Sequence, residues 1–153
     1  MSGGELVSLE GHTAPVKSAG FSPDGNTIVT ASLDGSARLW DLSGGELASL
    51  DGHTDAVLSA VFSPDGNTIV TAGADSKARL WNLFGDELAT LEGHSGWVTT
   101  AGFSPDGASN FTTALDGSAK IWDLAGNELI SLNGHTVIRV VSNNEFHILR
   151  ICC

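Results

Sequence analysis

Short stretches in which apolar and polar residues alternate run along the chain, separated by residues that favour tight turns. Between residues 12 and 50, the ranges 15–22, 27–32, 37–42 and 46–50 carry the β-branched, aromatic or alternating apolar residues typical of strands. The segments between them, Ser-Pro-Asp-Gly-Asn, Leu-Asp-Gly-Ser and Ser-Gly-Gly, are turn sequences. The pattern therefore predicts four short antiparallel strands and no helix, which is an all-β fold.

This unit repeats with a period of 41 residues. A Gly-His dipeptide opens each repeat, and a tryptophan lies near the end of the third expected strand; the histidines are His12, His53, His94 and His135, and the tryptophans are Trp40, Trp81 and Trp122. The sequence FSPDGNTIVTA occurs identically at residues 21–31 and 62–72. A fixed period of this length predicts an array of equivalent sheets that pack on one another.

The combination of Gly-His, a turn aspartate and a Trp-Asp or Trp-Asn pair in each 41-residue unit resembles the WD40 family of β-propellers. The resemblance covers residues 5–135. It implies four-stranded antiparallel blades arranged around a central axis. Three complete blades are expected at about residues 12–50, 53–91 and 94–132, followed by a partial fourth.

The resemblance also implies a hydrogen-bonded tetrad in each blade: a histidine, a serine or threonine on the second strand, a turn aspartate and a tryptophan. A buried indole N–H and imidazole need such partners. Gly73 and Ala114 stand at the position of Ser32, which predicts weaker tetrads in the second and third repeats unless Thr71 and Thr112 substitute. The expected members are His12, Ser32 (or Thr30), Asp34 and Trp40; His53, Thr71, Asp75 and Trp81; and His94, Thr112, Asp116 and Trp122.

The repeat pattern stops after Thr136. Residues 136–153 contain no glycine, two of the seven basic residues and both cysteines, Cys152 and Cys153. We expect a divergent tail that forms a hairpin from residues 137–141 and 146–151 around a turn at 143–144. Residues 5–9 match the fourth strand of each repeat and are expected to be a closing outer strand. The ring is then incomplete, or two chains associate to complete it; a truncated or frame-shifted gene product is the alternative.

The charge of the chain narrows the classes of partner. Seven basic and 18 acidic residues give a formal net charge of −11, which opposes binding to phosphate backbones and anionic lipid. We therefore expect neither nucleic acid nor a membrane as a partner. The first residues resemble no signal peptide, and adjacent cysteines cannot staple a fold, so a cytoplasmic location is expected.

The histidines and acids do not form a pattern for catalysis or metal binding. The Gly-His histidines recur once per repeat, which spreads them around an array, whereas a metal site needs three or four converging ligands. The sequence contains no phosphate-binding loop and no zinc-protease motif. We expect no enzymatic activity, no metal and no cofactor; an enzyme built on a propeller is the weaker alternative.

The most favoured function is a protein–protein interaction scaffold. In WD40 proteins, partners usually dock on the top face, near the start of the innermost strand and just before the turn aspartate. Trp97 breaks the Pro/Ala pattern of its position, and exposed tryptophan is enriched in binding hot spots. The matching residues are Pro15, Lys17 and Leu33; Ala56, Leu58 and Ala74; and Trp97, Thr99 and Leu115. Other proteins, including a second copy that completes the ring, are the expected partners.

Overall fold

A computed structural model describes residues 4–134, 136–141 and 145–150, and every regular element in these ranges is a β-strand. Three four-stranded antiparallel sheets follow one another along the chain. We call them blade 1, blade 2 and blade 3. Blade 1 contains β1 (Val16–Phe21), β2 (Thr27–Ser32), β3 (Ser36–Asp41) and β4 (Glu46–Asp51). Blade 2 contains β5 (Val57–Phe62), β6 (Thr68–Gly73), β7 (Lys77–Asn82) and β8 (Glu87–Glu92). Blade 3 contains β9 (Val98–Phe103), β10 (Ser109–Ala114), β11 (Ser118–Asp123) and β12 (Glu128–Asn133).

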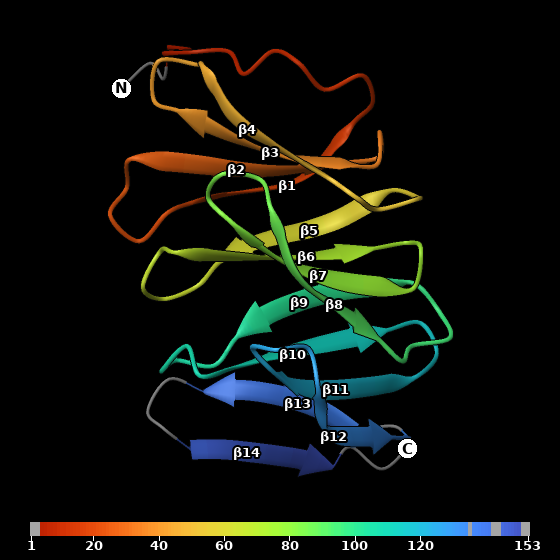
Figure 1. The fold of residues 1–153 in the computed structure, drawn as a ribbon. Coiled ribbons are helices and arrows are strands. Elements are labelled where there is room, and N and C mark those ends of the chain that lie inside the picture. Colours follow the sequence, from red (N-terminus) through yellow and green to blue (C-terminus); the bar gives the residue numbers. More distant parts are fainter. Residues whose placement is uncertain (1–3, 135, 142–144, 151–153) are drawn as a thin grey trace.

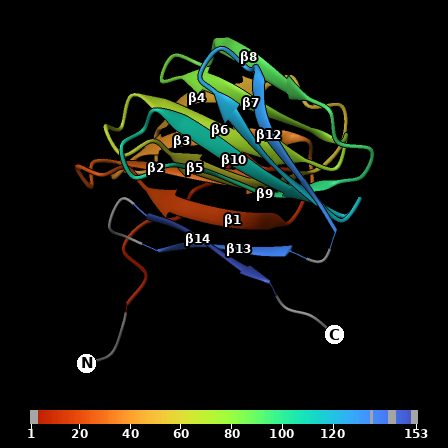
Figure 2. The ribbon, with the colours of Figure 1, turned by 90° about the horizontal axis from the view of Figure 1, so that it is seen from below.

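The three blades stack face to face, with blade 2 between the other two (Figure 1). Figure 2 shows that β1, β5 and β9 lie on one side of the stack and β4 and β8 on the opposite side. This arrangement confirms the all-β prediction of propeller-type blades. The ring is not closed.

The two ends of the chain differ in part from the expectation. Residues 136–150 contain two paired antiparallel strands, β13 (Thr136–Val141) and β14 (Glu145–Arg150), which form a separate two-stranded sheet. The turn expected at 143–144 and the expected strand end at 151 lie outside the described residues. Residues 5–9, which we expect to be a closing outer strand, form no strand in the single chain. A strand needs a neighbouring strand to bond to, and no described strand pairs with this segment; its role in a closed ring stays a prediction.

Turn chemistry fixes the connection between the first two strands of each blade. In blade 1 the Ser22 hydroxyl donates to Asp24 at 2.6 Å and accepts the Thr27 amide at 2.9 Å. Gly25, with a φ of 75°, supplies the left-handed backbone of this turn. Ser63 and Ser104 make the same bonds to Asp65 and Asp106 in the other blades.

The core lies between the blades. Val29, Ala31 and Leu39 of blade 1 are fully buried against Val57 and Ile69 of blade 2 in one apolar cluster. A second cluster joins blade 2 to blade 3 in the same way. Each sheet therefore carries apolar side chains on both faces and needs a neighbour on each of them.

One turn residue departs from the geometry of its equivalents. Ser76 has a φ of 66° in the turn before β7, where blades 1 and 3 have Gly35 and Gly117 at φ values of 87° and 80°. A residue with a side chain is less stable than glycine in the left-handed region by about 1–2 kcal/mol. Glycine loses more backbone entropy on folding, which reduces its advantage by about 0.5–1 kcal/mol.

Ser76→Gly is therefore expected to raise the free energy of unfolding by about 0.5–1 kcal/mol, measured by urea denaturation. The matched control is Gly35→Ser, which should destabilise the chain by a similar amount, since a Cβ there meets its nearest neighbour at an ordinary 3.5 Å. A Ser76→Gly variant no more stable than the wild type would contradict the strain at this position.

Candidate functional site

A threonine hydroxyl on the second strand joins the tryptophan and the histidine of every blade. The indole nitrogens of Trp40, Trp81 and Trp122 donate to Thr30, Thr71 and Thr112 at 2.8, 2.9 and 2.9 Å. The same three hydroxyls lie 2.7 Å from Nε2 of His12, His53 and His94. The antiparallel register that sets residue 28 against residue 40 places the threonine two residues further along the same face.

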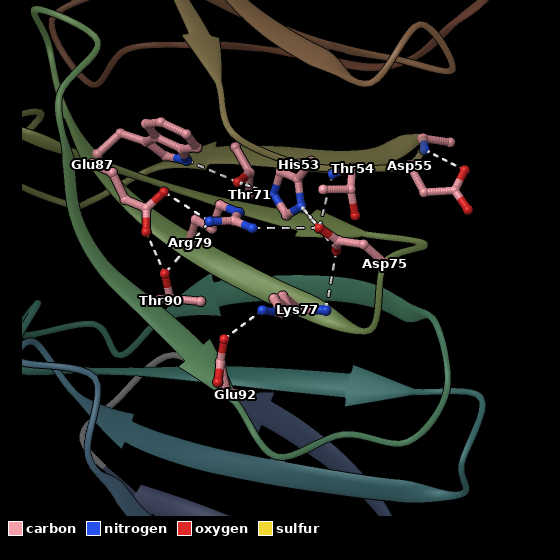
Figure 3. A network of polar contacts seen from close by, with 12 residues as sticks. His53, Thr54, Asp55, Thr71, Asp75, Lys77, Arg79, Glu87, Thr90 and Glu92 are labelled. Carbon is pink, nitrogen blue, oxygen red and sulfur yellow. Dashed lines mark hydrogen bonds and ion pairs between the residues drawn. The ribbon is translucent and has the colours of Figure 1, made fainter.

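The other imidazole nitrogen holds the turn aspartate. The Nδ1 atoms of His12, His53 and His94 lie 2.8, 3.0 and 2.9 Å from Asp34, Asp75 and Asp116. An indole N–H can only donate, so a neutral imidazole protonated on Nδ1 completes one chain of donation: tryptophan to threonine, threonine to histidine, histidine to aspartate. Figure 3 shows this chain for blade 2, together with its charged neighbours.

Thr30, not Ser32, is the hydroxyl of the first tetrad, so the placement of Ser32 there is wrong. Ser32 is fully buried, but its hydroxyl donates to the Ala14 carbonyl at 2.9 Å and accepts the Asp34 amide at 3.1 Å. It therefore fixes the approach to β1 and the turn after β2. The threonine hub is the same in all three blades, so Gly73 and Ala114 do not weaken it.

Gly73 makes room for the tetrad of blade 2. A Cβ at this position would overlap Nδ1 of His53 and stand 2.5 Å from Asp75 Oδ1. Without it, both carboxylate oxygens of Asp75 lie 3.0 Å from His53 Nδ1, whereas His12 has one aspartate oxygen in bonding range. The absence of a side chain thus leaves room for His53 Nδ1 to lie within bonding range of both carboxylate oxygens, at distances slightly longer than the single 2.8 Å contact between His12 and Asp34.

Burial and hydrogen bonding act against each other on the tetrad groups. Burial alone would raise the pKa of Asp75, but the bonds from His53 and the Thr54 and Lys77 amides outweigh it and hold the pKa below its usual 3.8. Burial lowers the pKa of His53 below 6.5, against the opposing effect of Asp75. The pKa values of Asp34 and Asp116 are also lowered: hydrogen bonds outweigh burial there. These shifts favour a neutral His53 imidazole beside an ionised Asp75 carboxylate in the tetrad of blade 2.

A second polar feature was not foreseen from the sequence. A cation on the third strand pairs with a glutamate on the fourth in every blade: Arg38 with Glu46 at 2.7 Å, Arg79 with Glu87 at 2.8 Å and Lys120 with Glu128 at 2.7 Å. Arg79 also lies 3.6 Å from Asp75. The recurring spacing of eight residues between opposite charges was the signal that could have revealed these pairs.

The tetrads offer no reacting group. The side chains of His12, His53 and His94 are 5%, 0% and 0% exposed, and both nitrogens of each are engaged. Within residues 4–134, 136–141 and 145–150, no three histidine, cysteine or acidic side chains are grouped to hold a metal ion. Nor does this part of the chain contain a helix that could span a membrane.

The expected partner-binding residues lie along one edge of the three blades, which we call the top edge. Backbone bonds pair them: the amides of Leu33, Ala74 and Leu115 donate to the carbonyls of Pro15, Ala56 and Trp97 at 3.0, 2.8 and 2.9 Å. Pro15, Lys17, Leu33, Trp97 and Leu115 are exposed, and Ala56, Leu58 and Thr99 are half-buried. Ala74 is only 6% exposed, so its assignment to a contact surface is wrong: the blade packs over it.

Repeated four-stranded blades with an internal His-Thr-Asp-Trp network define a propeller-type repeat protein. The family model described as "WD domain, G-beta repeat" matches at residues 3–41, 44–82 and 85–123. The chain belongs to this WD40 family. Each match starts in the outer strand position of one blade and ends at the third strand of the next.

Curated relatives resemble a single repeat. A stretch of 39 residues is 49% identical to serine-threonine kinase receptor-associated protein from Homo sapiens, and equally to the proteins of that name from Mus musculus and Bos taurus. The match covers 26% of this chain and spans 11% of the length of each relative.

Thr30→Val should cost about 1–3 kcal/mol of folding free energy, because it keeps the shape of the side chain and leaves buried polar groups of Trp40 and His12 unpaired. Ser32→Ala, two residues away on the same face, is the matched control and should cost less, since Ala114 occupies its position in blade 3. Urea denaturation of both variants checks this. An equal or larger loss from Ser32→Ala would contradict the threonine hub.

Stability should fall as the pH drops below about 6.5. The pKa of His53 is lower in the folded chain than in the unfolded chain, so on acidification the unfolded chain binds a proton at a higher pH than the folded chain does. The free energy of unfolding is therefore highest above the pKa of the unfolded state and falls as the pH drops towards the pKa of the folded state. The net charge of −11 becomes less negative over this range, which acts in the opposite direction. Urea denaturation at pH 7.5, 6.5 and 5.5 tests this expectation; stability that rises on acidification contradicts a neutral, buried His53.

Proposed function

We propose that the chain is a non-catalytic scaffold that binds another protein through the top edge. The main support is the difference in exposure between the tetrad side chains and the side chains of the top edge. The tetrads use their histidines, aspartates and tryptophans internally. Trp97 and Leu115, by contrast, are 51% and 68% exposed at the top edge.

The exposed large apolar side chains of this edge lie on its outer blades. Leu33 and Pro15 belong to blade 1, and Trp97 and Leu115 belong to blade 3. Blade 2, which lies between them (Figure 1), has the small Ala56 where blade 1 has Pro15 and blade 3 has Trp97, and its Leu58 is half-buried. Exposed apolar side chains on the two outer blades suit contact with apolar side chains of a protein partner.

The charge of the surface favours a protein partner with basic residues. Lys17 is the one basic residue among the proposed contacts, and the chain as a whole carries −11. Phosphate-rich partners are disfavoured by this field, and a basic peptide is attracted by it. A cytoplasmic location stays a prediction.

Trp97→Ala should weaken binding at least tenfold, since truncation of an interface tryptophan typically costs 2 kcal/mol or more. The probe is a set of peptides selected on the wild-type chain from a displayed random-peptide library, with affinities measured by fluorescence anisotropy. The control is Phe84→Ala, because Phe84 is 87% exposed in the turn between β7 and β8, outside the proposed contacts.

Selection of no peptide, or peptides that bind Trp97→Ala and the wild type equally, would overturn the proposal. Circular dichroism of both variants controls for folding.

A further inference from the structure

The face of blade 1 that points away from blade 2, which we call the front face, exposes side chains that are buried in the other blades. Val16 is 50% exposed, whereas the equivalent Val57 and Val98 are 0% exposed. Phe21 is 64% exposed, whereas Phe62 is 8% exposed. The residue types and strand positions are the same, so the difference measures a missing neighbour.

Blade 1 itself shows what covers such a face. Val57 and Phe62 of blade 2 are buried in one cluster with Val29, Ala31 and Leu39 of blade 1. Because residues 21–31 and 62–72 are identical in sequence, the front face of blade 1 presents nearly the surface that blade 2 presents to blade 1. The fitting partner is therefore a sheet of this same repeat.

The opposite end of the stack has the complementary open face. Phe111 and Ile121 of blade 3 are only half-buried, although the equivalent Val70 and Leu80 of blade 2 are covered by blade 3. Ile130 in β12 is 48% exposed. The two open faces lie at opposite ends of the stack, so one chain cannot bring its own pair together (Figure 1).

The segment 4–10 already lies where the outer strand of a neighbouring blade belongs. The Ser8 carbonyl stands 3.0 Å from the place that a Cβ on Gly44 would take. The equivalent glycines of the other blades have an outer strand of the preceding blade in this position. The Ser49 carbonyl of β4 lies 2.8 Å from where a Cβ on Gly85 would be, and the Thr90 carbonyl of β8 lies 3.2 Å from where a Cβ on Gly126 would be. An outer strand position is thus filled in front of blade 1, and its inner strands are lacking.

The hairpin β13–β14 supplies inner strands at the other end, beyond blade 3 (Figure 1). Its charge also fits. Residues 1–134 contain 17 of the 18 acidic residues and five of the seven basic ones, whereas residues 135–153 contain Glu145, Arg139 and Arg150. The tail is therefore net positive by one charge and the rest net negative, which favours contact between the tail of one copy and the front of another.

We infer that two copies of this chain associate head to tail, and that each closing blade is shared: β13–β14 of one copy covers the front face of the other, whose residues 4–10 act as its outer strand. Such an interface joins two different surfaces and closes into a ring when the rotation permits. The ring then contains three blades from each copy and two shared blades, and this number of blades is within the size range of propellers.

The test is the molar mass of the 153-residue chain by size-exclusion chromatography with light scattering. The wild type is expected at twice 15.8 kDa. Phe21→Asp on the front face should run as a monomer with unchanged circular dichroism. Val140→Pro, which interrupts the backbone pairing of β13 with β14, should also run as a monomer, with blades 1 to 3 still folded. Phe84→Asp, at a phenylalanine that is 87% exposed and lies in blade 2 away from both ends of the stack, should remain a dimer.

A monomeric wild type, or a mixture of sizes without a defined dimer, overturns the inference. A dimer that survives Phe21→Asp places the contact elsewhere and also overturns it. A dimer lost in Phe21→Asp but kept in Val140→Pro means that two front faces meet, which overturns the head-to-tail arrangement. Ala19→Arg, on the same exposed strand face, replaces Phe21→Asp if that variant does not fold.

Discussion

The packing of one blade on the next is the interaction on which the structure depends. Each sheet carries valine, leucine and alanine side chains on both faces, and these are buried only between two blades. No sheet has an interior of its own. A chain built from such units gains its stability at the interfaces, so the middle blade is fully supported and the outer two each depend on something beyond them.

The tetrads solve a different problem, which is how to hold a blade's turns against its strands. Each network ties the chain just before the innermost strand to the second strand, the following turn and the third strand through one threonine hydroxyl. The histidine and aspartate side chains of these networks are therefore engaged in hydrogen bonds within the blade. The networks hold in place the edges of the blades, where the proposed partner contacts lie.

Much of this architecture could be predicted from the sequence, because the 41-residue period and the turn sequences fix the strands and their order. The sequence could not show whether Thr30 or Ser32 belongs to the first tetrad, because both side chains lie on the same face of β2. The position of the Trp40 indole, which donates to Thr30, decides this. The irregular state of residues 5–9 depends on a missing neighbour, and the burial of Ala74 depends on packing. Neither leaves a mark in the local sequence.

The same dependence on neighbours explains why the ends of the stack differ from its middle in exposure, although their sequences are nearly equal. It also connects the two proposals: a top edge can present contacts to a partner only while the blades beneath it stay packed.

Residue-resolved hydrogen exchange of the monomeric Val140→Pro variant, in which blades 1 to 3 keep their sequences, tests the dependence on blade packing most directly. The account predicts that amides of β6 and β7 in blade 2 are protected most strongly, because neighbours cover both faces of that sheet, and that the equivalent amides of β2 and β3 in blade 1 exchange faster. Equal protection of the two blades, or stronger protection in blade 1, would contradict it.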